Sequence, residues 1–427
     1  MKKVKLIFFA ILFFTMIVLC SCGNTTESSV DSVTDISQET SKDTLDSQTD
    51  ITEQTSSVVD TNSQSEAESE TETESETETE EVVYEAKVIE NEDGTKTLMY
   101  LTYEMNQPTF IPYYHNYQAA VSFTFDDGYD TGTGEFVTSL FKTYGFHGTA
   151  MLGPCFLDDT KNAKWRTILS EGYLDVGCHG YNHLNPVGLD PSKYEHEIKD
   201  ALDYLKAAFP SQNVLTFATP YAHIDNSYEA YLKEYFLSNR LEVDGHVVRL
   251  GAEFNPMRIR SYSFNKGQSG AQLSDIKANI DLSIRKGRWA TVLCHCVVDE
   301  PVNSTDVAKS VFTEFCQYLY DNYNGKVWFC SFEEATIFQN QLLNAKINYT
   351  ACDKDSLSFN ITCDLDNEIF NIPMSATISL PSFVTTAKAV IDGTEQDLEI
   401  IEDKDGNKTV SVLDIPVNGS DIKIFIS

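Results

Sequence analysis

Two hydrophobic patterns alternate along the middle of the chain, from about residue 117 to residue 343. Short apolar runs typical of buried strands, such as AAVSFTF, GTAML, LDVGCH and RWATVLCH, are separated by segments with the apolar spacing of amphipathic helices. Strand and helix alternation on this scale predicts an α/β fold with a parallel sheet, closed as a barrel. Functional groups of such a fold lie at the carboxyl ends of the strands.

The pattern changes on both sides of this segment. Residues 84–116 contain two alternating runs, YEAKVIE and KTLMYLTY, around a turn signal, which predicts a β-hairpin that leads into the barrel. From 346 to 427 the helical spacing disappears, and short alternating runs predict a small β-sandwich. Its first two runs predict a hairpin that would place Cys352 and Cys363 about 20 Å apart, which is too far for a disulfide.

Residues 22–82 have the composition of a disordered acidic tether. Positions 24–81 contain no aromatic residue and hold 18 Asp and Glu against the single Lys42, which is about half of the net charge of −34. Such a segment cannot bury enough apolar surface to fold, and its like charges repel one another. Fully extended, it would reach up to about 200 Å. The rest of the chain is moderately acidic, which argues against a nucleic-acid partner.

Residues 1–21 have the layout of an export signal: three lysines, an apolar run that is too short for a membrane span, and then small residues. The closing LCSC resembles the bacterial lipobox, in which cleavage precedes a cysteine that becomes diacylated, here Cys22. A plain signal peptide or an uncleaved anchor is the alternative. Each version places the remaining chain outside the cytoplasm, and the lipobox version anchors it to the outer face of the membrane.

Polar side chains with catalytic chemistry occur where predicted strands end. Asp126 and Asp127 close AAVSFTF, and His179 and His183, four residues apart, follow LDVG. Two imidazoles and one carboxylate form a facial ligand set with open positions, suited to Zn²⁺, Co²⁺, Ni²⁺ or Fe²⁺. Asp-Asp-Gly by itself is ordinary turn sequence, and a lone His-x-x-x-His is more often structural, so the combination carries the prediction.

Two later strand ends extend the series. TFATPYAH contains Pro220 and Tyr221 in a fixed turn whose backbone N–H could face a bound carbonyl. ATVLCHC ends a strand at His295, with Leu293 on the same side. Taken singly, a loop and a core histidine explain these residues. Four such pieces in order, each at a strand end, are not explained by chance.

The series TFDDG, HGYNH, ATPYA and LCH resembles the motifs of the NodB-type polysaccharide deacetylases, carbohydrate esterase family four, over roughly residues 117–340. The resemblance implies a distorted (β/α) barrel and one bound divalent metal, with zinc as the first expectation. It implies that Asp127, His179 and His183 are the metal ligands. The substrate class that it implies is an acetylated polysaccharide.

The same resemblance implies roles for three further residues. An amide is a poor electrophile, so its hydrolysis needs a metal that polarises the carbonyl and lowers the pKa of a water molecule. Asp126 would take a proton from that water, and His295 would give one to the departing nitrogen. The backbone N–H of Tyr221 would line the oxyanion site.

The chain departs from the family pattern in the third motif. Many members carry an arginine two residues before the proline, where it orients the catalytic aspartate, and here Ala218 occupies that position. The glycine of that motif is replaced by Ala222. We expect the missing charge to come from MRIRSYSF, in which Arg258 and Arg260 would share one face of a strand. His223 is either a substrate contact or a loop histidine without a role.

Three functions fit these observations. The first is a monomeric, metal-dependent hydrolase that removes acetyl groups from an N-acetylated, or O-acetylated, polysaccharide at the cell surface, with peptidoglycan or poly-N-acetylglucosamine favoured. The second is a catalytically inactive carbohydrate-binding lipoprotein on the same fold, and the third is a solute-binding or adhesion lipoprotein. Retention of Asp126 and His295 favours the first, since a binding protein needs neither a base nor an acid.

Overall fold

The structure is a computed structural model, and it describes residues 85–90, 96–101, 108–243, 248–265, 273–352 and 356–427. The predicted export signal and tether, including Cys22, lie outside the described residues. So does the turn of the first hairpin, whose two strands, β1 (Glu85–Glu90) and β2 (Lys96–Leu101), pair in antiparallel fashion. Within the described part of the chain, no helix is both long and apolar enough to cross a membrane.

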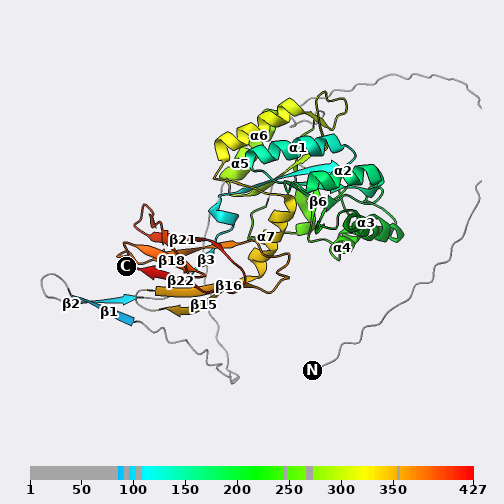
Figure 1. Ribbon diagram of the computed structural model, residues 1–427. Helices are drawn as coiled ribbons and strands as arrows, with labels where there is room; N and C mark the ends of the chain where they lie inside the picture. Colours follow the sequence, from blue (N-terminus) through cyan, green and yellow to red (C-terminus); the bar gives the residue numbers. More distant parts are fainter. Residues whose placement is uncertain (1–84, 91–95, 102–107, 244–247, 266–272, 353–355) are drawn as a thin grey trace, which may run out of the picture. The chain divides into compact units, whose positions relative to one another are not determined.

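A nine-stranded parallel sheet forms the middle of the chain (Figure 1). Its hydrogen-bonded order is β10-β11-β4-β5-β6-β7-β8-β9, and β14 also pairs with β4. The strands are β4 (Ala120–Asp127), β5 (Gly148–Leu152), β6 (Leu174–Cys178), β7 (Thr216–Ala218), β8 (Ser238–Leu241), β9 (Ile259–Arg260), β10 (Tyr262–Ser263), β11 (Trp289–Cys294) and β14 (Trp328–Phe329). Since only Ser261 separates β9 from β10, the two ends of the path meet in one chain segment. The sheet is therefore a nearly closed barrel, which confirms the predicted fold class.

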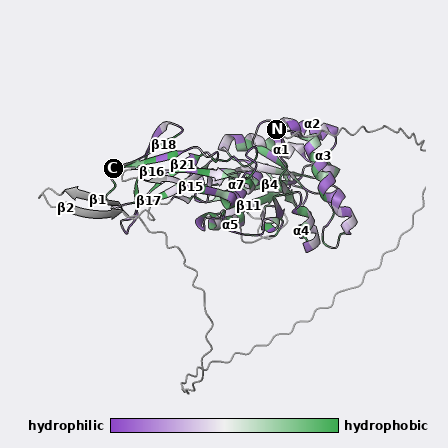
Figure 2. Ribbon diagram, turned by 90° about the horizontal axis from the view of Figure 1, so that it is seen from below, coloured by the Kyte–Doolittle hydropathy of each residue, from purple (hydrophilic) through white to green (hydrophobic). Residues whose placement is uncertain are grey.

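Helices follow most of these strands and cover the barrel (Figure 1). They are α1 (Thr131–Tyr144), α2 (Asp159–Leu169), a π-helical turn (Glu195–Asp200) continued by α3 (Ala201–Ala208), α4 (Asn226–Leu232), α5 (Leu273–Arg285), α6 (Lys309–Tyr323) and α7 (Phe332–Asn344). Hydrophobic residues concentrate on β4 and β11, whereas hydrophilic residues lie along the helices (Figure 2). This distribution is that of amphipathic helices around an apolar sheet.

Strand β4 shows why its sequence alternates. Phe123 and Phe125 face outward onto the helices, where both rings lie near Phe141 of α1 and Phe312 of α6. The residues that alternate with these two phenylalanines point into the barrel, because neighbouring side chains of a strand face opposite sides. Ser122 there accepts a hydrogen bond from the Trp289 indole at 2.9 Å. The same alternation directs Asp126 into the barrel interior.

Two antiparallel sheets follow the barrel. One has the order β15-β16-β22-β18-β19 and the other β20-β21-β17-β3, and apolar residues of both sheets share one buried cluster. The strands are β15 (Ala345–Cys352), β16 (Ser356–Cys363), β17 (Met374–Leu380), β18 (Ala387–Ile391), β19 (Thr394–Leu398), β20 (Ile401–Glu402), β21 (Lys408–Ile415) and β22 (Ile422–Ile426). The predicted C-terminal β structure is therefore present.

One strand of these sheets comes from the segment that precedes the barrel in the sequence. β3 (Thr109–Phe110) pairs with β17, with Phe110 opposite Ala376. Two residues are too few to show alternation, so this pairing could not be predicted from the sequence. The β15–β16 hairpin has the predicted geometry, since Cys363 lies opposite Ala345 and Cys352 opposite Leu357. Cys363 is a free thiol.

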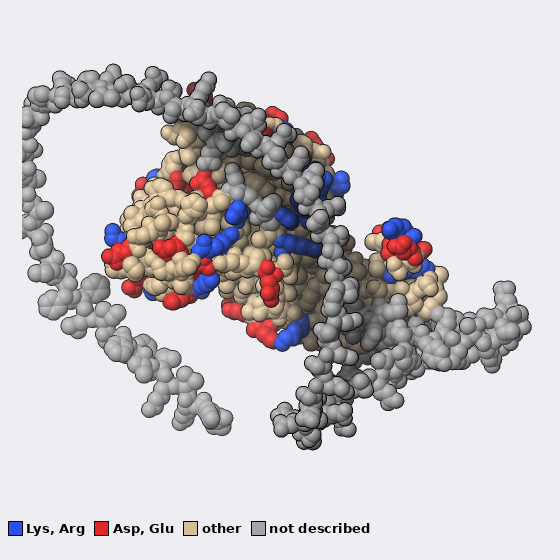
Figure 3. Space-filling view, turned by 180° about the vertical axis from the view of Figure 1, so that it is seen from behind, with Lys and Arg blue, Asp and Glu red and all other residues tan. Residues whose placement is uncertain are grey.

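Charged side chains of both signs are interspersed on the face of the described residues seen in Figure 3. Ion pairs at the surface of the described residues include Lys142 with Glu171 at 3.2 Å and the partly exposed Lys277 with Glu314 at 3.0 Å. Exposed pairs of this kind contribute at most about 1 kcal/mol to stability. The stability of the fold therefore depends on its buried groups.

Three ionisable side chains lie at the amino-terminal edge of the barrel strands. The Nδ1 atom of His147 lies 2.9 Å from a carboxylate oxygen of Glu334, and this hydrogen bond raises the pKa of His147 although burial opposes it. Burial raises the pKa of Glu333 to about 7. Burial, with the negative charge of Glu333, also raises the pKa of Asp175 well above its ordinary value.

The raised pKa of Glu333 predicts a pH-dependent loss of stability. A carboxyl group whose pKa is higher in the folded than in the unfolded chain makes unfolding easier as pH rises from about 4 to the folded pKa. Glu333→Gln should therefore raise the free energy of unfolding by about 2 kcal/mol more at pH 8 than at pH 5.5. Urea unfolding at both pH values, with chelator present, measures this difference. Glu314→Gln, at an exposed pair, is the matched control, and an equal effect of both variants would contradict the prediction.

Candidate active site

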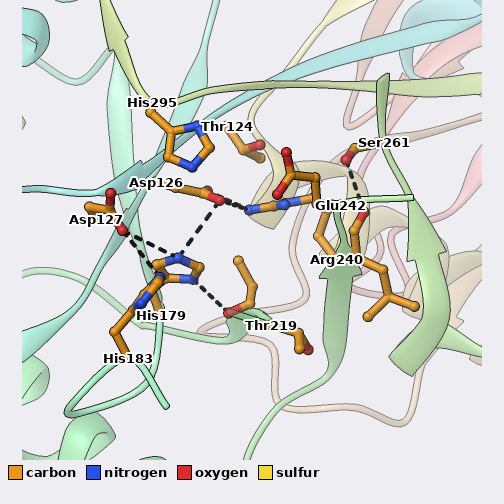
Figure 4. Close-up of polar contacts among 12 residues, drawn as sticks. Thr124, Asp126, Asp127, His179, His183, Thr219, Arg240, Glu242, Ser261 and His295 are labelled. Carbon is orange, nitrogen blue, oxygen red and sulfur yellow. Dashed lines mark hydrogen bonds and ion pairs between the residues drawn. The ribbon is translucent and has the colours of Figure 1, made fainter. Parts of the chain in front are cut away.

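The carboxyl ends of β4 and β6 bring three predicted metal ligands together. One ligand atom each from Asp127, His179 and His183 lies within 4.8 Å of the other two. The Nε2 atoms of His179 and His183 lie 3.6 and 3.4 Å from Oδ1 of Asp127 (Figure 4). The histidine spacing in the sequence thus corresponds to a real convergence of both rings on one carboxylate.

The chemistry of these side chains fits a divalent metal. Oδ1 of Asp127 is buried and accepts no hydrogen bond from the described residues. Nδ1 of His179 lies 2.8 Å from the carbonyl oxygen of Ala218, so it carries the proton and leaves Nε2 free to bind a cation. Burial and the neighbouring His179 lower the pKa of His183, which keeps it in the neutral form that a metal ligand needs.

The turn after β4 is strained in a way that serves the site. Asp127 and Gly128 have φ angles of 72° and 83°, in the left-handed region that favours glycine. A Cβ atom on Gly128 would lie 2.3 Å from a methyl carbon of Leu152, so a side chain cannot fit there. Asp-Asp-Gly is therefore a turn as well as a ligand motif, and the turn directs Asp127 toward the histidines.

Asp126 lies beside the ligands in a different environment. It is 5% exposed, and the fully buried Arg240 of β8 donates from Nη2 to both of its carboxylate oxygens. Burial acts to raise the pKa of Asp126, but the charges of Arg240, His179 and His295 outweigh it and hold this pKa below its ordinary value. Asp126 is therefore a carboxylate at neutral pH, as a general base must be.

Arg240 corrects the expectation from the sequence. Arg258 lies in a 3₁₀ turn (Pro256–Arg258) and pairs with Glu229 at 2.5 Å, while Arg260 lies on β9 with an exposed side chain. Neither is the partner of Asp126, so that prediction was wrong. In the register of β7 and β8, Arg240 lies directly beside Ala218, the position where the family arginine was expected. The positive charge is therefore supplied by β8, the strand next to β7, which carries Ala218.

The remaining predicted residues are His295 and Tyr221, which lie beside the site, and three support residues. His295 follows β11, faces Asp126 (Figure 4), and its Nδ1 lies 3.4 Å from the Asn265 side chain. Tyr221 is 57% exposed, with its ring 4.9 Å from that of His183. Among the other predicted support residues, Pro220 and Leu293 are buried, and His223 is exposed in the loop that follows Tyr221.

The Asp126–Arg240 pair predicts a large and partner-dependent stability effect. Arg240→Met leaves a buried carboxylate without its counter-charge, so it should lower the free energy of unfolding by about 3–5 kcal/mol. Adding Asp126→Asn removes the unpaired charge and should restore more than half of that loss. Denaturant unfolding of both variants tests this, with Arg258→Met as the control at a half-exposed pair. A double variant as unstable as the single one would contradict the assignment.

Backbone geometry explains the second departure from the third motif. Ala222 has a φ angle of 76° and Tyr221 one of 58°, so the chain keeps the conformation that a glycine would favour. Ala222→Gly should therefore stabilise the protein by about 0.5–1 kcal/mol. Ala163→Gly, the same change within helix α2, should destabilise it by a similar amount. Thermal unfolding measures both, and effects of the same sign would refute the prediction.

Comparisons with known proteins agree with this geometry. Residues 115–238 match the family model described as polysaccharide deacetylase. A Bacillus sp. protein named gellan lyase is 22% identical over 321 residues, which are 70% of this chain and 12% of that protein. The chain thus spans about an eighth of the length of the curated relative that it matches.

Several solved structures are similar to part of the chain. A Mycobacterium smegmatis polysaccharide deacetylase structure is 14% identical and covers 54% of this chain and 93% of its own, with a TM-score of 0.41. The peptidoglycan deacetylase PdaC from Bacillus subtilis has 16% identity, 52% and 93% coverage, and a TM-score of 0.34. A family 4 carbohydrate esterase from Streptomyces lividans has 17% identity, 50% and 92% coverage, and a TM-score of 0.34.

The matched segment contains the two aspartates, the two histidines and the turn at Tyr221, whereas Arg240 and His295 follow it in the chain. The barrel around this segment places all of them at one site. Residues 115–238, which supply most of the site, therefore resemble the polysaccharide deacetylase family.

Proposed function

We propose that this protein is a metal-dependent hydrolase that removes acetyl groups from an N-acetylated polysaccharide. The observation that carries the proposal is that two adjacent aspartates at the end of β4 have different surroundings. Asp127 joins two histidines in a ligand set, and Asp126, one residue earlier, is held as a carboxylate by Arg240. A protein that only binds carbohydrate needs no ionised base beside a metal site.

In this reaction the metal, when bound, would polarise the acetyl carbonyl and make water acidic enough to react near neutral pH. Asp126 accepts the proton from the attacking water, and Arg240 fixes the orientation of its carboxylate. His295, on the other side of the site, donates a proton to the departing nitrogen. The Tyr221 backbone N–H faces the developing oxyanion, where a positioned donor is most effective. Zinc is the metal that two histidines and one carboxylate favour.

The inactive binding protein is the second candidate, and its main support was the missing arginine of the third motif. Arg240 supplies that charge from the neighbouring strand. Ala222 keeps the backbone conformation of the missing glycine. Both departures are therefore compatible with catalysis, which favours the hydrolase.

We further propose that the hydrolase acts on the envelope polymer around its own cell, with peptidoglycan or poly-N-acetylglucosamine ahead of a diffusible substrate. A diacylated Cys22 would anchor the chain to the outer face of the membrane, since two acyl chains give stable anchoring. The acidic tether would carry the barrel outward. An anchored enzyme meets nearby polymer at a high effective concentration.

Acetate release tests the reaction. The metal-loaded protein should release acetate from peptidoglycan or N-acetylglucosamine oligomers faster than from O-acetylated xylan. Asp126→Asn and His295→Ala should each reduce kcat by about 10² or more, the usual effect of losing a positioned base or acid. His196→Ala, on an exposed helix surface, is the control and should keep normal activity. Near-normal turnover in either of the first two variants would remove its assigned role.

Metal analysis tests the ligand set separately from activity. We expect about one zinc per chain in the purified protein, because three ligands converge on one point. His179→Ala and His183→Ala should lower the affinity for zinc by at least about 10-fold, the smaller end of the effect of disturbing a metal site. His196→Ala, on an exposed helix surface, should retain the metal. Unchanged zinc content in the first two variants would refute the assignment.

A further inference from the structure

A cavity of about 650 Å³ opens at the amino-terminal ends of the barrel strands, away from the candidate active site. His147 directly precedes β5, Asp175 is the second residue of β6, and Trp328 begins β14, so the cavity lies at the amino-terminal edge of the sheet. The metal-binding side chains follow the carboxyl ends of the same strands. The cavity is therefore separate from the candidate active site.

Aromatic rings form one wall of this cavity. Tyr114 lies 5.5 Å from Trp328 and 6.5 Å from Tyr117, measured between ring centroids, and all three line the cavity. Tyr114 and Tyr117 are half-buried, so part of each ring faces the open space. Rings with an apolar face and a polar tip suit a ligand that is apolar on its faces and polar at its edges, as a pyranose is.

Elsewhere the lining is acidic, and the described residues that form it include no lysine or arginine. Its carboxylates come from Asp175, Glu333, Glu334 and Glu368, and its one basic side chain, His147, already pairs with Glu334. Oδ1 of Asp175 is buried and accepts no hydrogen bond from the described residues. Glu333 is 6% exposed and accepts a hydrogen bond from the Leu215 backbone. Lys206, which does not line the cavity, only partly offsets the effect of burial on the pKa of Glu333.

The outer wall of the cavity is fixed in place. Gln341 of α7 is fully buried, donates to the carbonyl of Ile372 at 2.9 Å and accepts from its N–H at 3.2 Å. This paired hydrogen bond holds the segment that contributes Glu368 and Asn371. A ligand would therefore enter a largely preformed site, as is usual for small-molecule pockets.

We propose that this cavity binds a hexosamine unit whose amine is free, in a polysaccharide chain. The aromatic wall would pack against the sugar ring, and the ammonium group would place a positive charge beside Asp175 and Glu333. An N-acetylated unit has no such charge. The raised pKa values of both groups have the same main cause, since burial disfavours their ionised forms.

This inference rests on the proposed function for its biological meaning, because a free amine is what deacetylation leaves on the polymer. A product-binding site at the far end of the barrel would keep the protein on polymer that it has already modified. Neighbouring acetylated units would then be presented to the active site at a high effective concentration.

Binding can be measured without turnover in the full chain carrying His179→Ala. We would titrate it with glucosamine hexamer and with N-acetylglucosamine hexamer in 0.3 M salt, and follow heat and tryptophan fluorescence. Trp328 lines the cavity, so its fluorescence should change on binding, and the cavity variants distinguish this change from one at Trp165, whose indole donates to Gly128 beside the active site. The glucosamine hexamer should bind at least about 10-fold more tightly than the acetylated hexamer.

Variants of the cavity locate the binding. Glu333→Gln, Glu368→Gln and Tyr117→Ala should each weaken binding of the glucosamine hexamer, by about 10-fold for the buried Glu333. Glu314→Gln and Tyr349→Ala, an exposed acid and an exposed aromatic elsewhere, should leave it unchanged. Glu368 is exposed, so its variant will fold even where a buried change does not.

Two results would overturn the proposal. Equal affinity for both hexamers would exclude recognition of the amine. Tight binding of the glucosamine hexamer that no cavity variant weakens would indicate general attraction to an acidic chain. The outcome is independent of the proposed reaction, since cavity-dependent binding could persist in a protein that releases no acetate, and acetate release could occur without it.

Discussion

The buried ion pair between Asp126 and Arg240 is the interaction on which the candidate site depends. Both side chains lie inside the barrel, with 5% and 0% exposure, and an unpaired charge at such depth is strongly unfavourable. The Nε and Nη1 atoms of Arg240 have no hydrogen-bond partner among the described residues, so Asp126 supplies the compensation through Nη2. Each residue is therefore tolerated in the interior because the other is present.

This constraint explains how two adjacent aspartates acquire different roles. The alternation of β4 directs Asp126 inward to Arg240, where it stays ionised. The left-handed turn at Asp127 directs the next carboxylate toward His179 and His183 instead. One peptide unit thus separates a base from a metal ligand. Different surroundings of neighbouring carboxylates are a common means of assigning them different chemistry.

The sequence could predict the features that depend on long patterns or on strand ends. The alternation of strands and helices indicated the barrel, and the histidine spacing after LDVG indicated the ligand set, which the structure brings together. Arg240 was missed because β8 has only four residues, and because its role depends on lateral register with Ala218 rather than on spacing along the chain. The available signal was the arginine in the short segment LSNRLEV, between two predicted elements of the barrel.

Arg240 replaces the absent arginine of the third motif, and moving the positive charge back to position 218 tests this replacement. Acetate release per bound zinc would be compared among the wild type, Arg240→Ala and the double variant Ala218→Arg with Arg240→Ala, with folding checked by thermal unfolding. Arg240→Ala should lose at least about 10² in acetate release, and the double variant should recover at least about 10-fold of that loss. Near-normal acetate release by Arg240→Ala would show that Arg240 does not take the place of the missing arginine.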